Sequence, residues 1–205
     1  MKALIVVDMQ NDFMEHGALA VPGADDAFAF RVKSYINHLL HSPEPPMLVF
    51  TQDTHPMNHE FFAENHNDKR HFEIDLDGNT FWPAHCVIGD YGWEFHPLLQ
   101  HITPYADVII RKGMNRFVDS YSAFFDNDGV SSGLGAMLTT KGVNEIEIIG
   151  LALDYCVAWT ALDASTIKSM AVTVNAEFCK AINPGHNMQR ELNNAGVFIK
   201  ESNHV

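Results

Sequence analysis

A cysteine stands where an apolar segment gives way to a helical pattern. Residues 146–150 are mostly apolar and end in Gly150, and small and apolar residues recur at helical spacing over residues 157–164. We therefore predict a buried parallel strand, a tight turn, and a helix whose first turn carries Cys156, with Asp154 as its N-cap. Unpaired backbone amides and the helix dipole favour a thiolate there, which makes Cys156 a candidate nucleophile. A lone cysteine is more often a small buried hydrophobic residue, so this interpretation depends on what surrounds it.

Two charged residues could act together with this thiol. Asp8 ends the first apolar run of the chain, and Lys112 ends a later one. A carboxylate beside a thiol can accept its proton and later return it to a leaving amine, and an ammonium group can stabilise the thiolate. Amides at the turn before the helix could bind an oxyanion. The set suits acyl transfer from an amide through a thioester; structural roles for Asp8 and Lys112 are the alternative.

A second group of residues has the side chains that bind transition metals. Asp53 and His55 are two residues apart, which places them on the same side of an extended segment, and His85 follows later. One carboxylate and two imidazoles suit Zn²⁺, Mn²⁺ or Fe²⁺. The alternative is chance, because the chain has 12 histidines and several more of them lie in this stretch: His59, His66 and His71.

Apolar runs alternate with amphipathic segments along the chain. The expected strands are residues 3–7, 47–50, 106–110, 145–150, 172–175 and 197–199, and the expected helices are residues 24–41, 131–140, 154–170 and 185–195. This alternation predicts an α/β fold: a doubly wound, Rossmann-like, six-stranded parallel sheet with helices on both faces, in a single domain spanning residues 1–205. Residues 53–105 lack periodicity, and so long a loop is usually functional.

The expected strand order brings the candidate residues to one edge of the sheet. Doubly wound sheets commonly have the order 3-2-1-4-5-6, in which the first and fourth strands are neighbours. Asp8 and the turn of Cys156 would then flank one crevice, and Asp53 and Lys112 would end the second and third strands on the same edge. Such folds bind ligands at this edge, so the convergence of these four residues predicts an active site.

Composition restricts the partners and the compartment. The chain has 205 residues, is 46% hydrophobic and has a formal net charge of −13, which disfavours nucleic acid and anionic membranes as partners. Three cysteines without framework spacing disfavour disulfides. The first apolar run is broken at Asp8, which is too early for a signal peptide, and no run of 18 apolar residues follows. We therefore expect a protein of the reducing cytoplasm.

Six segments together resemble one enzyme family. They are residues 7–13, 17–22, 52–59, 80–87, 119–127 and 150–164. Their content and order are similar to those of the nicotinamidase/pyrazinamidase group of the isochorismatase-like cysteine hydrolase superfamily. The resemblance implies the isochorismatase-like hydrolase fold and hydrolysis of nicotinamide, and also of pyrazinamide, as a step of NAD salvage. Together these segments run from the first expected strand to the fifth.

The resemblance also implies roles for individual residues. Cys156 would be the nucleophile, Asp8 the general base and acid, and Lys112 the third member of the triad. The amides of Ala152 and Cys156 would form the oxyanion hole, with a cis peptide bond entering Ala152. The remaining assignments complete the implied site: Asp53, His55 and His85 as ligands of one divalent metal ion, zinc first with iron or manganese as alternatives, and Phe13, Trp82 and Tyr121 around the pyridine ring.

Other interpretations stay open at the level of sequence. A related cysteine amidase could act on another small amide, such as a carbamoyl or ureido compound, and a silent binding protein could keep the pocket. An isochorismatase is disfavoured because that reaction needs no such metal set. The chain departs from the family at Leu153, where threonine is usual, and at Thr54, where many relatives have tryptophan. The role of His59, the relative preference for the two amides and assembly into a homo-oligomer are left open.

Overall fold

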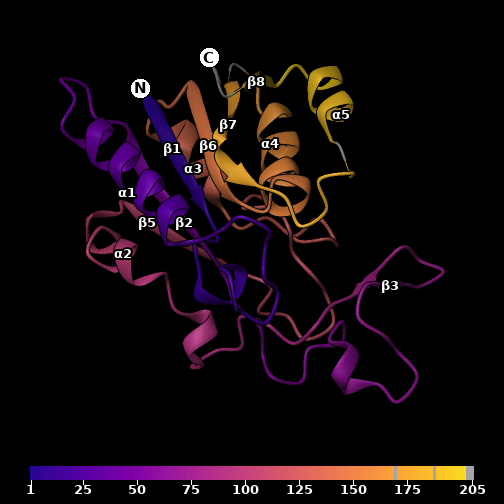
Figure 1. The fold of residues 1–205 in the computed structure, drawn as a ribbon. Helices are drawn as coiled ribbons and strands as arrows, with labels where there is room; N and C mark the ends of the chain where they lie inside the picture. The colour runs from indigo at the N-terminus through magenta and orange to yellow at the C-terminus, as the bar shows by residue number, and fades with distance from the viewer. Residues whose placement is uncertain (169, 187, 202–205) are drawn as a thin grey trace.

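A six-stranded parallel sheet forms the centre of the protein (Figure 1). The structure is a computed structural model that describes residues 1–168, 170–186 and 188–201. In spatial order the strands are β5 (Val108–Lys112), β2 (Met47–Asp53), β1 (Lys2–Val7), β6 (Glu145–Leu151), β7 (Ala171–Lys180) and β8 (Phe198–Lys200). When these six strands are numbered in the order in which they occur along the chain, their spatial order is 3-2-1-4-5-6. The predicted doubly wound sheet is therefore confirmed.

The helices lie on both faces of this sheet. They are α1 (Asp26–Leu40), α2 (Pro97–Gln100), α3 (Leu134–Thr140), α4 (Ala158–Ser165) and α5 (Gln189–Asn194). Short 3-10 turns are η1 (Asn11–Phe13), η2 (Ala63–Asn65), η3 (Tyr91–Trp93) and η4 (Thr103–Tyr105), and the π-helical turn η5 (Leu153–Val157) precedes α4. Helix α1 covers one face, and α3, α4 and α5 cover the other (Figure 1).

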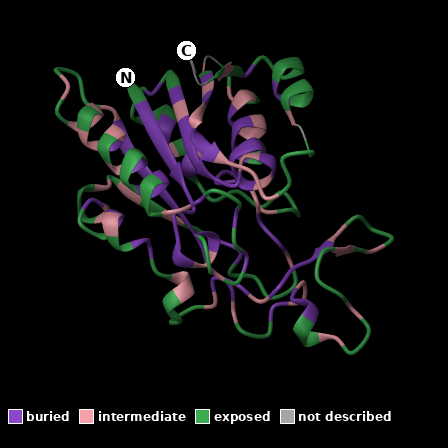
Figure 2. Cartoon of the chain, in the orientation of Figure 1, coloured by how far each residue is buried: buried purple, intermediate pink, exposed green. Residues whose placement is uncertain are grey.

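Alternation along the strands divides the core in two. On β1, Leu4 and Val6 pack with apolar residues of α1, whereas Ala3, Ile5 and Val7 pack with α3 and α4. Because consecutive side chains of a strand point to opposite faces, a strand that is apolar at every position has to be covered on both sides. Figure 2 shows this central strand buried along most of its length, while the outer surfaces of the helices are exposed.

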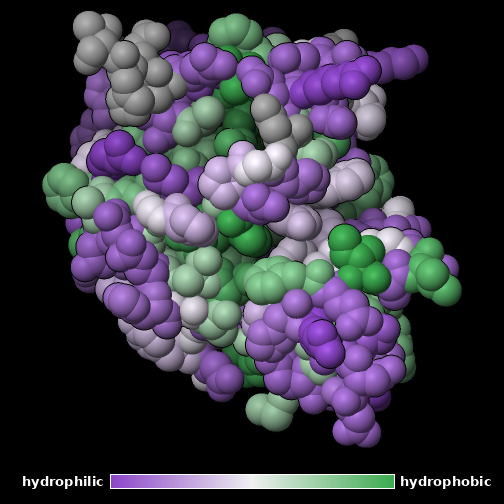
Figure 3. Space-filling view, turned by 45° about the vertical axis from the view of Figure 1, so that its right-hand side comes forward, coloured by the Kyte–Doolittle hydropathy of each residue, from purple (hydrophilic) through white to green (hydrophobic). Residues whose placement is uncertain are grey.

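The segment between β2 and β5 forms a separate layer of loops at the carboxyl edge of the sheet. It contains a short antiparallel hairpin, β3 (Glu73–Ile74) and β4 (Thr80–Phe81), which projects from the body (Figure 1). Three large apolar side chains in and beside this hairpin are exposed: Phe72, Ile74 and Leu76. Apolar groups elsewhere on the surface form separate patches among hydrophilic ones (Figure 3). No helix among the described residues has both the length and the apolar character needed to cross a membrane.

The element boundaries differ from expectation at two functional places. Strand β5 starts and ends two residues later than expected, because its pairing with β2 begins at Val108 opposite Val49, and Lys112 therefore lies within the strand as its last residue. The helix after β6 is shorter than expected and begins with the wide turn η5. Residue 187 of the expected helix 185–195 and residue 169 of the expected helix 154–170 lie outside the described residues.

Candidate active site

Four strand ends bring their charged or nucleophilic side chains into contact. Asp8 follows β1, Asp53 ends β2, Lys112 ends β5, and Cys156 lies in the turn after β6. All four are buried. The Lys112 Nζ donates hydrogen bonds to Asp53 Oδ1 at 3.0 Å, to the Ser120 carbonyl at 3.1 Å and to Cys156 Sγ at 3.4 Å. The convergence expected from strand order is therefore present, with Lys112 at its centre.

The contact between Lys112 and Asp8 differs from the other three. Nζ lies 2.9 Å from Asp8 Oδ2, an ion pair without hydrogen-bond geometry, so Oδ2 has no hydrogen-bond partner. An ammonium group has three protons and here has four acceptor neighbours, so its contact with Asp8 is chiefly electrostatic. Asp8 Oδ2 thus lies beside the cation that also contacts the thiol, while it remains free to accept a proton.

The turn that carries Cys156 depends on its local backbone. Gly150 has φ of 116°, and a Cβ there would lie 2.2 Å from the Val7 carbonyl oxygen, so only glycine allows β1 and β6 to approach so closely. The peptide bond between Leu151 and Ala152 is cis, as the resemblance implies. Ala152 and Cys156, the expected oxyanion-hole residues, line the same cavity.

The prediction that Asp154 caps this helix is wrong. The capping position is Ala152, and no side chain caps the turn. Because the helix opens with a wide π-helical turn, Asp154 lies inside that turn and reaches across to another loop. Its carboxylate accepts hydrogen bonds from the amides of Ile182 at 2.9 Å and Asn183 at 2.8 Å. Asp154 therefore attaches the loop after β7 to the cysteine turn.

Burial sets the resting protonation of the thiol. It raises the pKa of Cys156 well above its ordinary value, and Lys112 opposes this only in part. Burial also raises the pKa of Asp8, again against Lys112. The pKa of Lys112 is well above its usual range, because Asp53 and Asp8 outweigh burial. Burial and the two neighbouring carboxylates thus oppose the thiolate that the helix end was expected to favour, and Asp8 is the carboxylate placed to accept the thiol proton.

The three expected metal ligands meet in one buried cluster. The ligand atoms of Asp53, His55 and His85 lie within 4.8 Å of one another. Asp53 Oδ2 is 3.0 Å from His55 Nε2 and 3.3 Å from His85 Nε2. Gly113 has φ of 74°, and a Cβ there would lie 2.5 Å from His55 Cε1, so a larger residue would displace this imidazole.

Hydrogen bonds on the far side of each ring fit a cation in this cluster. His55 Nδ1 lies 3.0 Å from the Gly113 carbonyl and His85 Nδ1 lies 2.7 Å from the Pro83 carbonyl. A carbonyl only accepts, so each Nδ1 carries a proton, and each Nε2 is the ring nitrogen that faces the Asp53 carboxylate. One carboxylate and two imidazole Nε2 atoms, each ring held by a carbonyl on its far side, form a donor set that Zn²⁺ or Fe²⁺ prefers.

Two further residues lie beside this cluster. His55, His59 and Asp119 form a second group with ligand atoms within 4.8 Å of one another. His59 is buried, its Nε2 has no hydrogen-bond partner, and burial together with His55 lowers its pKa to about 4. Sequence reasoning left His59 unassigned and gave Asp119 no role; the only signal for Asp119 was its place at the start of the segment 119–127.

Aromatic residues form the walls of the cavity above the thiol. The lining includes all three residues expected around the ring, Phe13, Trp82 and Tyr121. Trp82 Nε1 donates a hydrogen bond to the Tyr121 hydroxyl at 3.1 Å, which fixes these two side chains relative to each other. Sequence reasoning did not find Tyr155, which also lines the cavity and packs edge-on against Trp82 at a centroid distance of 4.9 Å.

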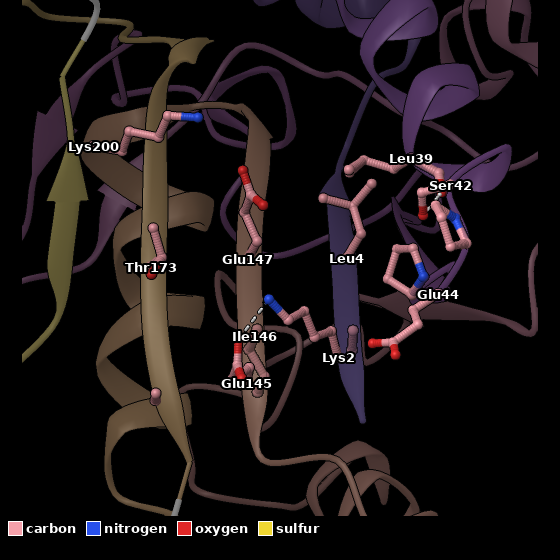
Figure 4. Close-up of a pocket in the computed structure, with 14 residues that line it drawn as sticks. Lys2, Leu4, Leu39, Ser42, Glu44, Glu145, Ile146, Glu147, Thr173 and Lys200 are labelled. Carbon is pink, nitrogen blue, oxygen red and sulfur yellow. Dashed lines mark hydrogen bonds and ion pairs between the residues drawn. The ribbon is translucent and has the colours of Figure 1, made fainter.

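A larger hollow lies elsewhere and contains none of these groups. It has a volume of about 620 Å³ and opens beside the amino ends of β1 and β6 (Figure 4). Its charged side chains include an exposed ion pair between Lys2 and Glu145 at 3.0 Å. The thiol, the triad and the metal cluster are at the opposite, carboxyl edge of the sheet, so the small aromatic cavity is the candidate active site.

Comparisons with known proteins agree with this fold. The family model described as the isochorismatase domain matches residues 2–196. The nicotinamidase of Acinetobacter baylyi is 42% identical over 191 residues, covering 91% of this chain and 85% of that protein. A solved nicotinamidase/pyrazinamidase from Acinetobacter baumanii is 38% identical with a TM-score of 0.85, covering 97% of this chain and 94% of that one. A pyrazinamidase of Pyrococcus horikoshii in complex with zinc is 34% identical with a TM-score of 0.74, covering 97% of each chain. With nearly its whole length matched, the chain belongs to the isochorismatase domain family.

Proposed function

We propose that this protein hydrolyses nicotinamide to nicotinate and ammonia through a thioester on Cys156. The observation that carries the proposal is the contact of one ammonium, Lys112 Nζ, with Asp8, Asp53 and Cys156 beneath an aromatic cavity. The similarity to nicotinamidases along most of the chain supports nicotinamide as the substrate. The pyrazinamidase relatives support pyrazinamide as a second substrate.

The first half of the reaction forms the thioester. Asp8 Oδ2 accepts the thiol proton, and Sγ of Cys156 attacks the carboxamide carbon to form a tetrahedral intermediate. Lys112 stabilises the sulfur anion while it forms. The amides of Ala152 and Cys156 donate to the oxyanion. When the C–N bond breaks, Asp8 returns its proton to the leaving nitrogen, and ammonia departs.

The second half releases the acid. Asp8, again a carboxylate, accepts a proton from a water molecule that attacks the thioester carbon. When the C–S bond breaks, Asp8 gives that proton to the sulfur, and the product acid ionises to nicotinate and leaves. Because burial raises the pKa of Asp8, its protonated form is stable enough to act as the acid in each half-reaction.

We further propose that Asp53, His55 and His85 hold one divalent metal ion, with zinc favoured by the similarity to the zinc-containing pyrazinamidase. A bound metal ion would supply a Lewis acid for the ring nitrogen of the substrate. The chain's own residues do the rest of the positioning: Phe13 and Trp82 enclose the ring, and Tyr121 is fixed by its hydrogen bond to Trp82.

The proposal is tested by assaying ammonia and nicotinate with the purified protein, and by measuring its metal content in the same sample. We expect one ammonia and one nicotinate for each nicotinamide consumed, and about one metal ion per chain. Cys156→Ala is the control, since it removes the sulfur alone. Ammonia release no faster than that of the control, with the metal site filled, would exclude the proposed reaction and favour a silent binding protein.

A further inference from the structure

A buried threonine contacts Asp8 at two points. Thr51, on β2, is fully buried. Its hydroxyl donates a hydrogen bond to Asp8 Oδ1 at 2.6 Å and accepts one from the Asp8 amide at 3.1 Å. A single hydroxyl therefore fixes both the backbone and the carboxylate of the same residue. Thr51 and Asp53 are two positions apart on β2 and so lie on the same face of that strand.

The backbone of Asp8 requires such a partner. Its φ of 45° lies in the left-handed region, which a residue with a side chain rarely adopts. This conformation turns the chain immediately after β1, where the Gln10 amide also donates to the Asp8 carbonyl at 2.8 Å. The Asp8 amide cannot continue the ladder of β1 in this conformation, and the Thr51 hydroxyl satisfies it instead.

The hydrogen bond to the carboxylate distinguishes its two oxygens. Oδ1 receives the Thr51 proton, whereas Oδ2 lies 2.9 Å from Lys112 Nζ and has no hydrogen-bond partner. The same Nζ contacts Cys156 Sγ at 3.4 Å, so Oδ2 and the sulfur share one neighbour. If the carboxylate rotated about its Cα–Cβ or Cβ–Cγ bond, a different atom would face Lys112 Nζ.

We propose that Thr51 is a positioning residue for the general base: it holds Asp8 so that Oδ2 is the oxygen that exchanges protons with Cys156 and the leaving nitrogen. The proposal rests on the amidase function proposed above. Thr51 can donate to Oδ1 whether Oδ2 is ionised or protonated, so it fixes the carboxyl group through both halves of the cycle. The proton itself moves only among Cys156, Asp8 and the leaving or attacking group.

Four charged or titratable groups interact with Asp8 from other parts of the fold. They are Lys112 at the end of β5, Asp53 at the end of β2, Cys156 in the turn after β6, and Cys86 in the loop between β4 and η3. Removal of the Thr51 hydroxyl changes none of these groups. It removes a hydrogen bond that favours the ionised carboxylate, so the protonated form of Asp8 should persist to higher pH. A purely structural threonine would not shift the pH profile in this direction.

Thr51→Val is the main test, because valine keeps the shape and removes only the hydroxyl. We expect kcat for nicotinamide to fall about tenfold or more, KM to stay within about threefold, and the acid limb of kcat/KM to move to higher pH. Thr51→Ser should restore most of kcat and return the acid limb of kcat/KM to nearly its wild-type pH. If Thr51→Val folds poorly, Thr51→Ala gives the same comparison without an apolar group against the carboxylate.

Thr160→Val is the matched control. Thr160 is equally buried, and its hydroxyl accepts a hydrogen bond from the Ala123 amide at 3.0 Å. Its loss should lower the unfolding temperature without moving the acid limb. If Thr51→Val behaved in the same way, with wild-type kcat and an unmoved limb, Thr51 would be structural only and the proposal would be wrong.

The rate of alkylation of Cys156 by iodoacetamide separates this proposal from the proposed function. It reports removal of the thiol proton and needs no substrate. We expect slower alkylation in Thr51→Val than in wild type, most of all below neutral pH, and recovery in Thr51→Ser. If wild type released no ammonia but alkylation still depended on Thr51 in this way, the nicotinamide reaction would fail and the positioning role would stand. Unchanged alkylation in an active enzyme would overturn the positioning role alone.

Discussion

Asp53 contacts Lys112 through one carboxylate oxygen and the histidine cluster through the other. Oδ1 lies 3.0 Å from Lys112 Nζ, and Oδ2 lies 3.0 Å from His55 Nε2 and 3.3 Å from His85 Nε2. One side chain thus belongs both to the proposed metal site and to the group around Cys156. His85, by contrast, makes no hydrogen bond or ion pair with this ammonium, and its Nδ1 contacts the Pro83 carbonyl. Substitutions of Asp53 and His85 are therefore not equivalent tests of the metal.

The first prediction compares the stability of these two variants without metal. Asp53→Ala removes one of the two buried carboxylates that pair with the Lys112 ammonium; because Asp8 remains beside the ammonium, we expect a loss on the order of 2 kcal/mol, less than the full cost of an unpaired buried charge. His85→Ala removes a side chain without an ammonium partner and should cost less. Urea unfolding with a chelator present measures both. Equal losses would mean that the Asp53–Lys112 pair contributes nothing specific to the fold.

The second prediction concerns the nucleophile. Cys156→Ala should abolish nicotinamide turnover and leave the fold intact, because members of a triad act as a unit and alanine fits among its small neighbours. Cys86→Ala and Cys179→Ala should change the rate little. Neither of these two thiols lines the aromatic cavity that contains Cys156. Activity of Cys156→Ala within tenfold of wild type would exclude the thioester mechanism.

The third prediction concerns the base and pH. Asp8 accepts a proton only as a carboxylate, and burial raises its pKa, so kcat/KM should rise with pH through a midpoint above the ordinary aspartate value of about 4. Asp8→Asn should lower kcat by about 10²-fold or more and should slow alkylation of Cys156 at neutral pH. Alkylation at the wild-type rate would mean that Lys112 alone controls the thiol.

Much of this site could be predicted from sequence because its reacting groups end strands. Asp8, Asp53 and Lys112 each follow an apolar run, and parallel strands end at one edge, so the order of the strands was enough to bring them together. Their roles in the reaction stay predictions. The directions of their contacts could not be predicted, since the preference of Lys112 Nζ for three partners over a fourth depends on side-chain angles.

Residues that act through long-range hydrogen bonds were missed for a related reason. Thr51 and Gln10 lie inside recognised motifs or strands, but their partners are 43 positions away along the chain. Gln10 is fully buried; it accepts from the Asp53 amide at 2.7 Å and donates to the Asp53 carbonyl at 2.8 Å. The sequence around a buried polar residue does not indicate with which distant backbone groups its side chain will form hydrogen bonds. Asp154 was misassigned in the same way, since its partners come from a distant loop.

The last prediction concerns the task of the metal site. A cysteine already supplies the nucleophile, so a metal ion held by Asp53, His55 and His85 is not needed to activate water, and a ring nitrogen could bind it instead. Benzamide has the shape of nicotinamide without that nitrogen. We therefore expect benzamide to be a much poorer substrate of the wild type. His85→Ala should remove most of the activity toward nicotinamide and little of the activity toward benzamide.

The two substrates and the two forms of the protein make a thermodynamic cycle. If the ring nitrogen and His85 act through the same interaction, the ratio of the rate with nicotinamide to the rate with benzamide should be smaller in His85→Ala than in wild type. The two changes would then be coupled, and their free-energy effects would not add. Asp53→Ala should behave differently, because loss of its contact with Lys112 should lower turnover of both substrates. If His85→Ala instead lowered both substrates by the same factor, the cluster would be acting on the chemistry or the fold, and anchoring of the ring would be the wrong role.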